Sequence, residues 1–205
     1  MTDTLTLYTH PMSRGRVARW MLEETGLQYE TVLLEYGTTM KASEYLAINP
    51  MGKVPALRHG DAVVTENSAI ALYLGDLAPD KQLAPAPGSA ERAAYYRWIS
   101  FMGPLEELMM AKQTGKLADP MTAGYGTEAD VVSTLEHAIG GRDFLAGDCF
   151  TMADLLVSAY IGWYLQFKLL EPRENFIRFV ELHRQRPAGL RAGALDDALM
   201  PKPVS

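Results

Sequence analysis

The chain has 205 residues, 48% of them hydrophobic, which suffices for a substantial core in one large domain or two small ones. Its net charge of −6 disfavours a nucleic-acid partner, because such proteins usually present a basic surface. Cys149 is the single cysteine, so an internal disulfide is excluded and a reducing compartment is expected. Neither a signal peptide nor a membrane-spanning apolar stretch is recognisable. We therefore expect a soluble cytoplasmic protein.

The N-terminal segment has the pattern of a strand, a helix and a second strand. Leu5–Tyr8 alternates in hydrophobicity and predicts a strand. Arg14–Glu24 has apolar residues at helical spacing, and Gly26 provides a C-cap. Tyr29–Leu34 predicts the next strand. Because a connection of this kind joins parallel strands, we expect these two strands to be parallel.

The next segment predicts the rest of a small α/β domain. After a loop, Lys41–Ala47 predicts a short helix. Val54–His59 and Val63–Thr65 predict two strands joined by a turn, and a helix follows over about Ser68–Leu77. The expected order of elements is β-α-β-α-β-β-α.

Pro55 stands out because proline cannot donate a hydrogen bond to a strand ladder. It belongs to the stretch Asn49–Leu57, which begins with turn residues and continues into the predicted strand. One interpretation is a cis Val54–Pro55 bond that leaves the backbone groups of Val54 free to pair with a peptide ligand. The alternative is an ordinary proline on an edge strand.

The second half of the chain predicts helices only. Residues 77–89 carry Pro79, Pro85, Pro87 and Gly88, which is typical of a linker. We expect a break at Gly103-Pro104 in the first long helix, and a capping-box variant over Thr151–Asp154. The predicted helices are Ala90–Lys112, Glu128–Ile139, Thr151–Leu170, Asn175–Gln185 and Gly189–Ala198. The domains are therefore expected at residues 1–80 and 90–205, with a linker at 81–89.

Two motifs carry a resemblance to a known family. GKVPAL at Gly52–Leu57 is followed by a short hairpin and by TENSAIALYL at Thr65–Leu74. Each motif alone is weak, but together at this spacing they are specific. The chain resembles the cytosolic glutathione S-transferases, and most closely their bacterial, serine-type (theta-like) members. The resemblance implies a thioredoxin-like N-terminal domain with a mixed four-stranded sheet, an all-α C-terminal domain, and glutathione as co-substrate.

Ser13 is the candidate catalytic residue. It lies between the first strand and the first helix, where a hydroxyl can donate a hydrogen bond to a ligand thiolate and so lower the thiol pKa. A role as a helix N-cap is the alternative from the residues alone. The resemblance places Ser13 where serine-type transferases have their catalytic serine. Tyr8 is the rival hydroxyl, because tyrosine-type members use a tyrosine at the end of the first strand.

The resemblance also implies a set of glutathione-binding residues. Val54 would pair its backbone with the cysteinyl unit, and Glu66 with Asn67 would hold the γ-glutamyl end at a helix N-terminus. Lys53 and Lys41 could meet the glycyl carboxylate. The alternatives are plain capping for Glu66 and Asn67, and solvated surface for the two lysines.

The second substrate is expected between the two domains. Its candidate lining residues could equally be core, because apolar residues at helical spacing more often pack inside. We expect a homodimer through the long helices. No metal is expected, since the four histidines lack ligand spacing. Asp154 is interpreted as structural, and Cys149 as a small buried residue. The lining candidates are Met12, Phe101, Met102, Pro104 and Leu105.

Together these features predict a glutathione transferase that conjugates the glutathione thiolate to small hydrophobic electrophiles. One alternative is a protein with this fold that binds ligands or partners without catalysis, because fold alone does not determine function. Another is a glutathione-dependent reductase or dehalogenase. The motifs do not separate these enzymes, because they differ in the pocket for the second substrate.

Overall fold

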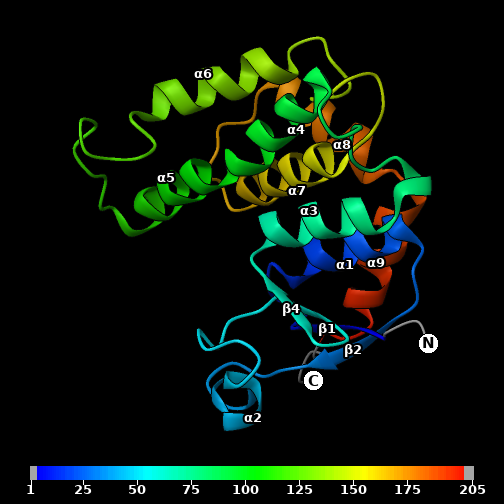
Figure 1. Cartoon of the computed structure of the whole chain (residues 1–205). Coiled ribbons are helices and arrows are strands. Elements are labelled where there is room, and N and C mark those ends of the chain that lie inside the picture. The colour runs from blue at the N-terminus through cyan, green and yellow to red at the C-terminus, as the bar shows by residue number, and fades with distance from the viewer. Residues whose placement is uncertain (1–3, 201–205) are drawn as a thin grey trace. The chain divides into compact units, whose positions relative to one another are not determined.

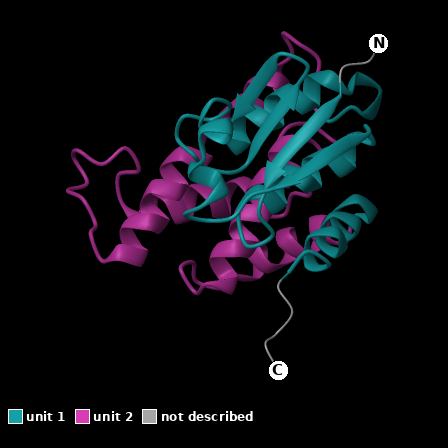
Figure 2. Cartoon of the chain, turned by 90° about the horizontal axis from the view of Figure 1, so that it is seen from below, with its two compact units in different colours: residues 1–83, 186–205 teal, residues 84–185 magenta. Residues whose placement is uncertain are grey.

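The computed structural model describes residues 4–200 (Figure 1). The chain folds into two compact units, drawn in different colours in Figure 2. The first contains the chain up to Leu83 together with the segment from Arg186 onward, and the second is Ala84–Gln185. The sequence predicts one helical domain over residues 90–205. The structure instead groups the last helix with the N-terminal elements.

A four-stranded mixed sheet forms the centre of the first unit. Its strands are β1 (Leu5–Thr9), β2 (Tyr29–Leu33), β3 (Ala56–His59) and β4 (Ala62–Thr65), in the order β2-β1-β3-β4. Strand β1 is parallel to β2 and antiparallel to β3, and β3 is antiparallel to β4. The thioredoxin-like order of elements and the parallel β1–β2 pair predicted from the sequence are confirmed.

Three longer helices complete this unit: α1 (Gly15–Thr25), α3 (Asn67–Leu77) and α9 (Pro187–Asp197). Helix α1 packs against β1, α3 and α9. It ends at Gly26, which has φ 69° and donates its N–H to the carbonyl of Leu22, as expected for a left-handed C-cap. Shorter turns are the 3₁₀ helices η1 (Thr39–Lys41) and η2 (Pro79–Lys81) and helix α2 (Ser43–Leu46).

Ion pairs join α9 to α1. Arg19 donates from Nε to Oδ1 of Asp196 at 2.8 Å, and both side chains are buried. Arg16 makes a similar contact of 2.7 Å with Asp197, but the Asp197 side chain is 70% exposed. Burial raises the pKa of the Asp196 carboxyl, although Arg19 stabilises its charged form. These ion pairs, together with the packing of α9 against α1, group α9 with the first unit.

A small cluster lies on the face of β1 opposite the buried Leu5 and Leu7. Tyr8 packs against buried Leu34, Met40, Tyr45 and Ala56. The rings of Tyr8 and Tyr45 are 5.5 Å apart. Burial raises the pKa of Tyr45 to about 12. The cluster ties the η1–α2 segment to the sheet.

The Val54–Pro55 peptide bond is cis. Strand β3 begins at Ala56, so Pro55 stands just before the ladder and no strand hydrogen bond is lost. The cis bond of the first interpretation is confirmed, and the pairing of Val54 with a peptide ligand stays a prediction.

The second unit is helical, as predicted. Its helices are α4 (Ala90–Ser100), α5 (Met102–Thr114), α6 (Glu128–Ile139), α7 (Met152–Gln166) and α8 (Glu174–Arg184). Helix α7 is the core helix, and α4, α5 and α8 pack against it. Helix α6 has the predicted bounds, whereas α7 ends before Leu170 because Lys168 adopts a left-handed φ of 57°.

The predicted break in the first long helix lies slightly earlier than expected. Helix α4 ends at Ser100 and α5 starts at Met102, with Phe101 between them. Pro104 therefore falls in the first turn of α5, where its missing N–H costs no hydrogen bond.

Asp154 is buried at the start of α7 and accepts three hydrogen bonds. Its donors are the backbone N–H of Leu145 at 2.7 Å, and the N–H and hydroxyl of Thr151, each at 2.8 Å. The predicted capping box is thus present. Burial nevertheless raises the pKa of Asp154 to about 6, because the desolvation of the carboxylate outweighs these hydrogen bonds.

This pKa predicts a pH-dependent contribution to stability. Between the ordinary value of 3.8 and about 6, the folded state binds more protons than the unfolded state. The free energy of unfolding of the wild type should therefore fall, relative to that of Asp154→Asn, by roughly 2 kcal/mol as pH rises from about 4 to 6. Urea unfolding of both proteins across this range measures the difference.

The matched control for Asp154→Asn is Asp130→Asn. Asp130 forms the same kind of capping box with Thr127 at the start of α6, but it is exposed. Subtracting the change in unfolding free energy caused by Asp130→Asn from that caused by Asp154→Asn isolates the part due to burial. If the wild type instead becomes more stable relative to Asp154→Asn as pH rises, the assigned direction of the Asp154 pKa shift is wrong.

Cys149 is exposed, in the loop before α7. The expectation that it is a small buried residue is wrong. The loop turns its neighbour Phe150 into the core instead, and Gly147 in the same loop has φ 91°.

Candidate glutathione site at one end of the sheet

The strand register brings four chain segments to the same end of the sheet. Tyr8 in β1 pairs with Ala56 at the start of β3, and Ala56 pairs with Thr65 at the end of β4. Thr9, the last residue of β1, pairs with Leu33, the last residue of β2. The segments that follow β1, β2 and β4, and the segment that precedes β3, therefore leave the sheet at one edge. These are the segments that carry Ser13, Lys41, Glu66 and Val54.

Ser13 is buried in the turn between β1 and α1. Its backbone N–H and its hydroxyl both donate to the carbonyl of His10, at 3.1 and 2.7 Å. Its Oγ also accepts the N–H of Gly15, the first residue of α1, at 2.9 Å. Ser13 thus takes part in helix capping, and its oxygen is held in place from two sides.

Gly15 makes the close approach of this turn to the sheet possible. A Cβ at this position would lie 2.0 Å from Oγ1 of Thr9 and 2.9 Å from Oγ of Ser13. The Thr9 side chain is fully buried. Only glycine fits here without displacing the strand or the candidate hydroxyl.

Glu66 has an unusual backbone conformation, φ 67° and ψ 125°, directly before α3. Such a conformation costs about 1–3 kcal/mol in a residue other than glycine, and it concentrates at functional sites. The Glu66 side chain is exposed and makes no capping hydrogen bond within residues 4–200. Simple capping therefore does not explain this residue.

Asn67 connects α3 to the turn of Ser13. It is buried, and its Nδ2 donates to the backbone carbonyl of Arg14 at 3.2 Å. The structure thus brings the Glu66-Asn67 pair and the Ser13 turn together, as the sequence analysis required of a shared site.

Val54 presents its backbone at the same edge. Its N–H and C=O make no hydrogen bond to other residues of the described part, 4–200. The preceding carbonyl, that of Lys53, accepts a hydrogen bond from Nδ2 of Asn49 at 2.8 Å, which fixes the loop. The loop therefore holds an available donor and acceptor pair in a defined place.

Lys41 and Lys53 are both exposed. Lys41 donates from Nζ to the carbonyl of Met51 at 2.9 Å, so its charge lies beside the loop that contains Lys53. The two lysines put positive charge near Val54, and their predicted contact with a carboxylate stays a prediction.

Tyr8, the rival hydroxyl, is half-buried in the cluster with Tyr45 on the side of β1 opposite the buried Leu5 and Leu7. Its ring packs against this cluster and lies 5.5 Å from the ring of Tyr45. The choice between Ser13 and Tyr8 as the activating group is a matter for experiment.

The candidates for the second-substrate pocket belong to both units. Met12 in the first unit is 52% exposed. In the second unit, Phe101 packs edge-on against Trp98 at 5.5 Å, and Met102 and Leu105 are buried. A pocket that combines them stays a prediction.

Sequence reasoning missed a group of side chains around the Ser13 turn. His10 is buried, and its Nδ1 accepts the N–H of Met12 at 3.1 Å. Its Nε2 lies 3.5 Å from a carboxylate oxygen of Glu35, and its ring lies 4.7 Å from that of Tyr36. The available signal was the His10-Pro11 pair, which lies between the first strand and Ser13.

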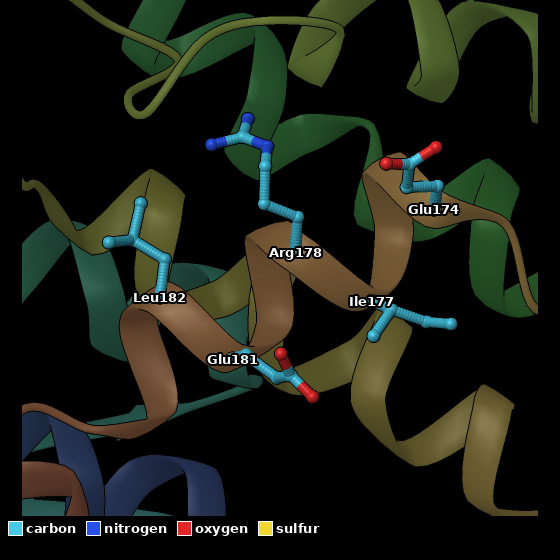
Figure 3. A pocket seen from close by; sticks show the side chains of 5 residues that line it. All are labelled: Glu174, Ile177, Arg178, Glu181 and Leu182. Atoms are coloured by element: carbon cyan, nitrogen blue, oxygen red, sulfur yellow. The ribbon is translucent and has the colours of Figure 1, made fainter.

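A pocket on the second unit contains none of the predicted site residues. All of its lining residues come from α8, and Figure 3 shows that the charged side chains among them do not converge on one point. Arg178 instead donates to Asp143 at 2.7 Å and to the carbonyl of Ile139 at 3.0 Å. The lining residues are Glu174, Ile177, Arg178, Glu181 and Leu182.

Two other features are absent from residues 4–200. That part of the chain has no cluster of three or more histidine, cysteine, aspartate or glutamate side chains arranged to hold a metal ion. It also has no helix with the length and apolar character needed to cross a membrane.

Comparison with known proteins agrees with this geometry. Residues 3–76 match the glutathione S-transferase N-terminal domain, and residues 109–187 match the glutathione S-transferase C-terminal domain. Glutathione S-transferase GST-4.5 of Xanthomonas campestris is 30% identical over 166 residues, which cover 77% of this chain and 81% of the relative.

Solved structures give the same result. A glutathione S-transferase from Xylella fastidiosa superposes with a TM-score of 0.76 at 26% identity, covering 94% of this chain and 98% of the other. A sphingomonad glutathione S-transferase complexed with glutathione superposes with a TM-score of 0.73 at 28% identity, with the same two coverages, 94% and 98%. The mixed sheet with its helical second unit and the relatives of similar length lead to one conclusion: this chain belongs to the glutathione S-transferase family.

Proposed function

We propose that this protein is a glutathione transferase that conjugates the glutathione thiolate to small hydrophobic electrophiles, with Ser13 as the catalytic residue. One observation carries the proposal. The register of the sheet gathers the hydroxyl of Ser13, the available backbone groups of Val54 and the strained Glu66 at one edge. Each of these groups suits a different part of glutathione.

The proposed binding mode follows from this arrangement. The N–H and C=O of Val54 pair with the cysteinyl unit in the manner of an added strand. Glu66 accepts a hydrogen bond from the γ-glutamyl ammonium group, and the neighbouring carboxylate lies at the N-terminus of α3 beside Asn67. Lys53 and Lys41 face the glycyl carboxylate. The thiol is then directed toward the end of β1, where Ser13 lies.

The hydroxyl of Ser13 can stabilise the thiolate without moving its oxygen. The N–H of Gly15 holds Oγ, so only the hydroxyl proton must turn, from the carbonyl of His10 to the sulfur. This exchanges a neutral hydrogen bond worth about 1 kcal/mol for one to a charged group worth about 1.5–3 kcal/mol. The difference favours the thiolate and lowers the thiol pKa.

The thiolate then attacks the electrophilic carbon of the second substrate and forms a carbon–sulfur bond. With an activated halide, the halide leaves with the bonding electron pair. With an epoxide, the ring oxygen takes the pair and then a proton from water. Most of the rate gain comes from the greater thiolate fraction and from holding the two reactants together.

One observation favours the alternative of a binding protein without catalysis. The hydroxyl of Ser13 already donates to His10 and accepts from Gly15, as a purely structural helix cap would do. Under this alternative, glutathione binds but its thiol keeps an ordinary pKa.

An ultraviolet titration of bound glutathione tests the proposal. We expect thiolate absorbance in the wild type well below the free thiol pKa of about 8.5, and its loss in Ser13→Ala with glutathione still bound. Ser43→Ala, which removes an exposed hydroxyl at the start of α2, is the matched control and should behave as the wild type. An equally lowered pKa in Ser13→Ala would assign the activation to Tyr8 or the backbone instead.

We further propose that the protein works as a homodimer in the cytoplasm. The family resemblance and the long helices of the second unit support the dimer. Sedimentation equilibrium at micromolar concentration would contradict it by giving a mass near 22.7 kDa, the mass of one chain.

A further inference from the structure

We infer that His10 is a positioning residue for Ser13, acting through a neutral imidazole that carries its proton on Nε2. The inference rests on the proposed role of Ser13. It concerns what holds the Ser13 turn in place before any ligand binds.

His10 stabilises the turn that carries Ser13 through both its backbone and its side chain. The backbone carbonyl of His10 accepts both the N–H and the hydroxyl of Ser13. The side chain of His10 accepts the N–H of Met12 through Nδ1 at 3.1 Å. One residue therefore orients both the catalytic candidate and the peptide group just before it.

The acceptor role of Nδ1 determines the tautomer of the ring. A nitrogen that accepts a backbone N–H cannot also carry a proton, so in the neutral ring the proton is on Nε2. Nε2 lies 3.5 Å from a carboxylate oxygen of Glu35, so a proton on Nε2 has a negative charge near it. The Glu35 side chain is 69% exposed, so this contact is weak, and the bond to Met12 is the main constraint.

Tyr36 holds the other side of the same peptide segment. Its hydroxyl donates to the carbonyl of Met12 at 3.3 Å, and its ring lies against the His10 ring. Both backbone groups of Met12 are thus held by side chains. The Met12 side chain itself is 52% exposed, so its own packing does not fix the turn.

Burial makes the loss of this contact costly. His10 is 4% exposed, and the hydrogen bond between its Nδ1 and the N–H of Met12 is partly buried. If the acceptor is removed, the N–H must find water, and the turn opens to let it. The hydroxyl of Ser13 then loses its fixed position relative to the sulfur.

Two substitutions separate the acceptor from the rest of the ring. Asparagine at position 10 can accept an N–H two residues further on, as in an Asx turn, but it lacks the aromatic contact with Tyr36. Phenylalanine keeps an aromatic ring against Tyr36 but has no acceptor. Both lose the contact with Glu35. A role for the acceptor predicts that His10→Asn behaves as the wild type and His10→Phe does not, whereas a role for the aromatic contact with Tyr36 predicts the reverse order.

The first measurement is nitrogen NMR of the His10 ring in the protein without glutathione. We expect the proton on Nε2 and a hydrogen-bonded Nδ1. A proton on Nδ1 would overturn the inference, whatever the role of Ser13, because the ring could then not accept the N–H of Met12.

The second measurement is the thiolate titration of bound glutathione in His10→Asn, His10→Phe and Ser13→Ala. We expect His10→Phe to raise the bound thiol pKa by about 1 unit, a tenfold loss of thiolate at pH values well below the wild-type pKa, with glutathione still bound. His10→Asn should stay within about 0.3 unit of the wild type. A merely structural role for His10 would weaken binding or stability without this ordered change in thiol pKa.

The outcomes distinguish the two proposals. If Ser13→Ala raises the thiol pKa but His10→Phe does not, His10 is not a positioning residue and the role of Ser13 stands. If His10→Asn behaves as His10→Phe, the acceptor is not what matters and the inference fails. If Ser13→Ala leaves the pKa unchanged, the role of Ser13 fails, and the positioning role of His10 falls with it.

Discussion

Replacing Asp196 by alanine is expected to lower the free energy of unfolding by about 3–5 kcal/mol. Asp196 is fully buried in α9, and it pairs with Arg19 of α1, which is 3% exposed. The substitution leaves a buried guanidinium without its counter-charge, and removing one partner of a buried ion pair is far more costly than the net value of the pair. Urea unfolding at fixed protein concentration measures the change.

The adjacent residue provides a matched control. Asp197 also pairs with an arginine of α1, Arg16, but its side chain is 70% exposed. Asp197→Ala should therefore cost no more than about 1 kcal/mol, as is usual for a surface ion pair. Equal small effects from both alanine variants would contradict the packing of α9 on α1.

A double substitution tests the cause of the Asp196 effect. Replacing both partners with apolar residues, as in Arg19→Met with Asp196→Leu, removes the unpaired charge and keeps buried volume. Such replacements of buried pairs are often neutral. We expect the double variant to recover most of the stability that Asp196→Ala loses. If it is no more stable than Asp196→Ala, the loss comes from packing and not from the uncompensated charge.

Gly15→Ala is expected to have a second large effect, on both stability and thiol activation. The added methyl group would lie 2.0 Å from Oγ1 and 3.0 Å from Cβ of Thr9, which is fully buried in β1. Overpacking of this severity should cost about 3 kcal/mol or more, because neither the strand nor the helix can move freely. The same methyl group would lie 2.9 Å from Oγ of Ser13, so thiolate formation should fall as well.

Unfolding and thiolate titration are the measurements for Gly15→Ala, with Gly193→Ala as control. Gly193 lies within α9 of the same unit, and an added Cβ there meets nothing within 4 Å. Alanine is the better helix former, so Gly193→Ala should be neutral or stabilising by up to about 1 kcal/mol. The double variant Thr9→Ala with Gly15→Ala should recover part of the loss. A Gly15→Ala protein as stable as the wild type would show that the turn can open without consequence.

Short-range features of the fold were predictable from the sequence because their partners are close along the chain. The parallel β1–β2 pair followed from strand and helix lengths. The capping box of Thr151 and Asp154 followed from a spacing of three residues, and the bounds of α6 were also correct. Each depends on local periodicity or on a hydrogen bond within one turn.

The candidate site was predictable in its residues but not in its geometry. The two motifs and the resemblance identified Ser13, Val54, Glu66 and Asn67. Their convergence depends on the register of three strand pairs, which is a long-range property. His10 was missed because its role depends on a side-chain bond inside an irregular turn, for which hydrophobic periodicity carries no signal.

The sequence by itself determined the family and the order of the elements and proposed a set of candidate site residues, because motifs, periodicity and caps are local properties. Tertiary structure alone decided that α9 packs on α1, since the sequence of a helix does not specify its partner and Asp196 pairs with Arg19, 177 residues away in the chain. It also decided that the loop before α7 exposes Cys149 and buries Phe150. In each case the free energy comes from burying surfaces and charges that are distant in the chain, and only the folded arrangement brings them together.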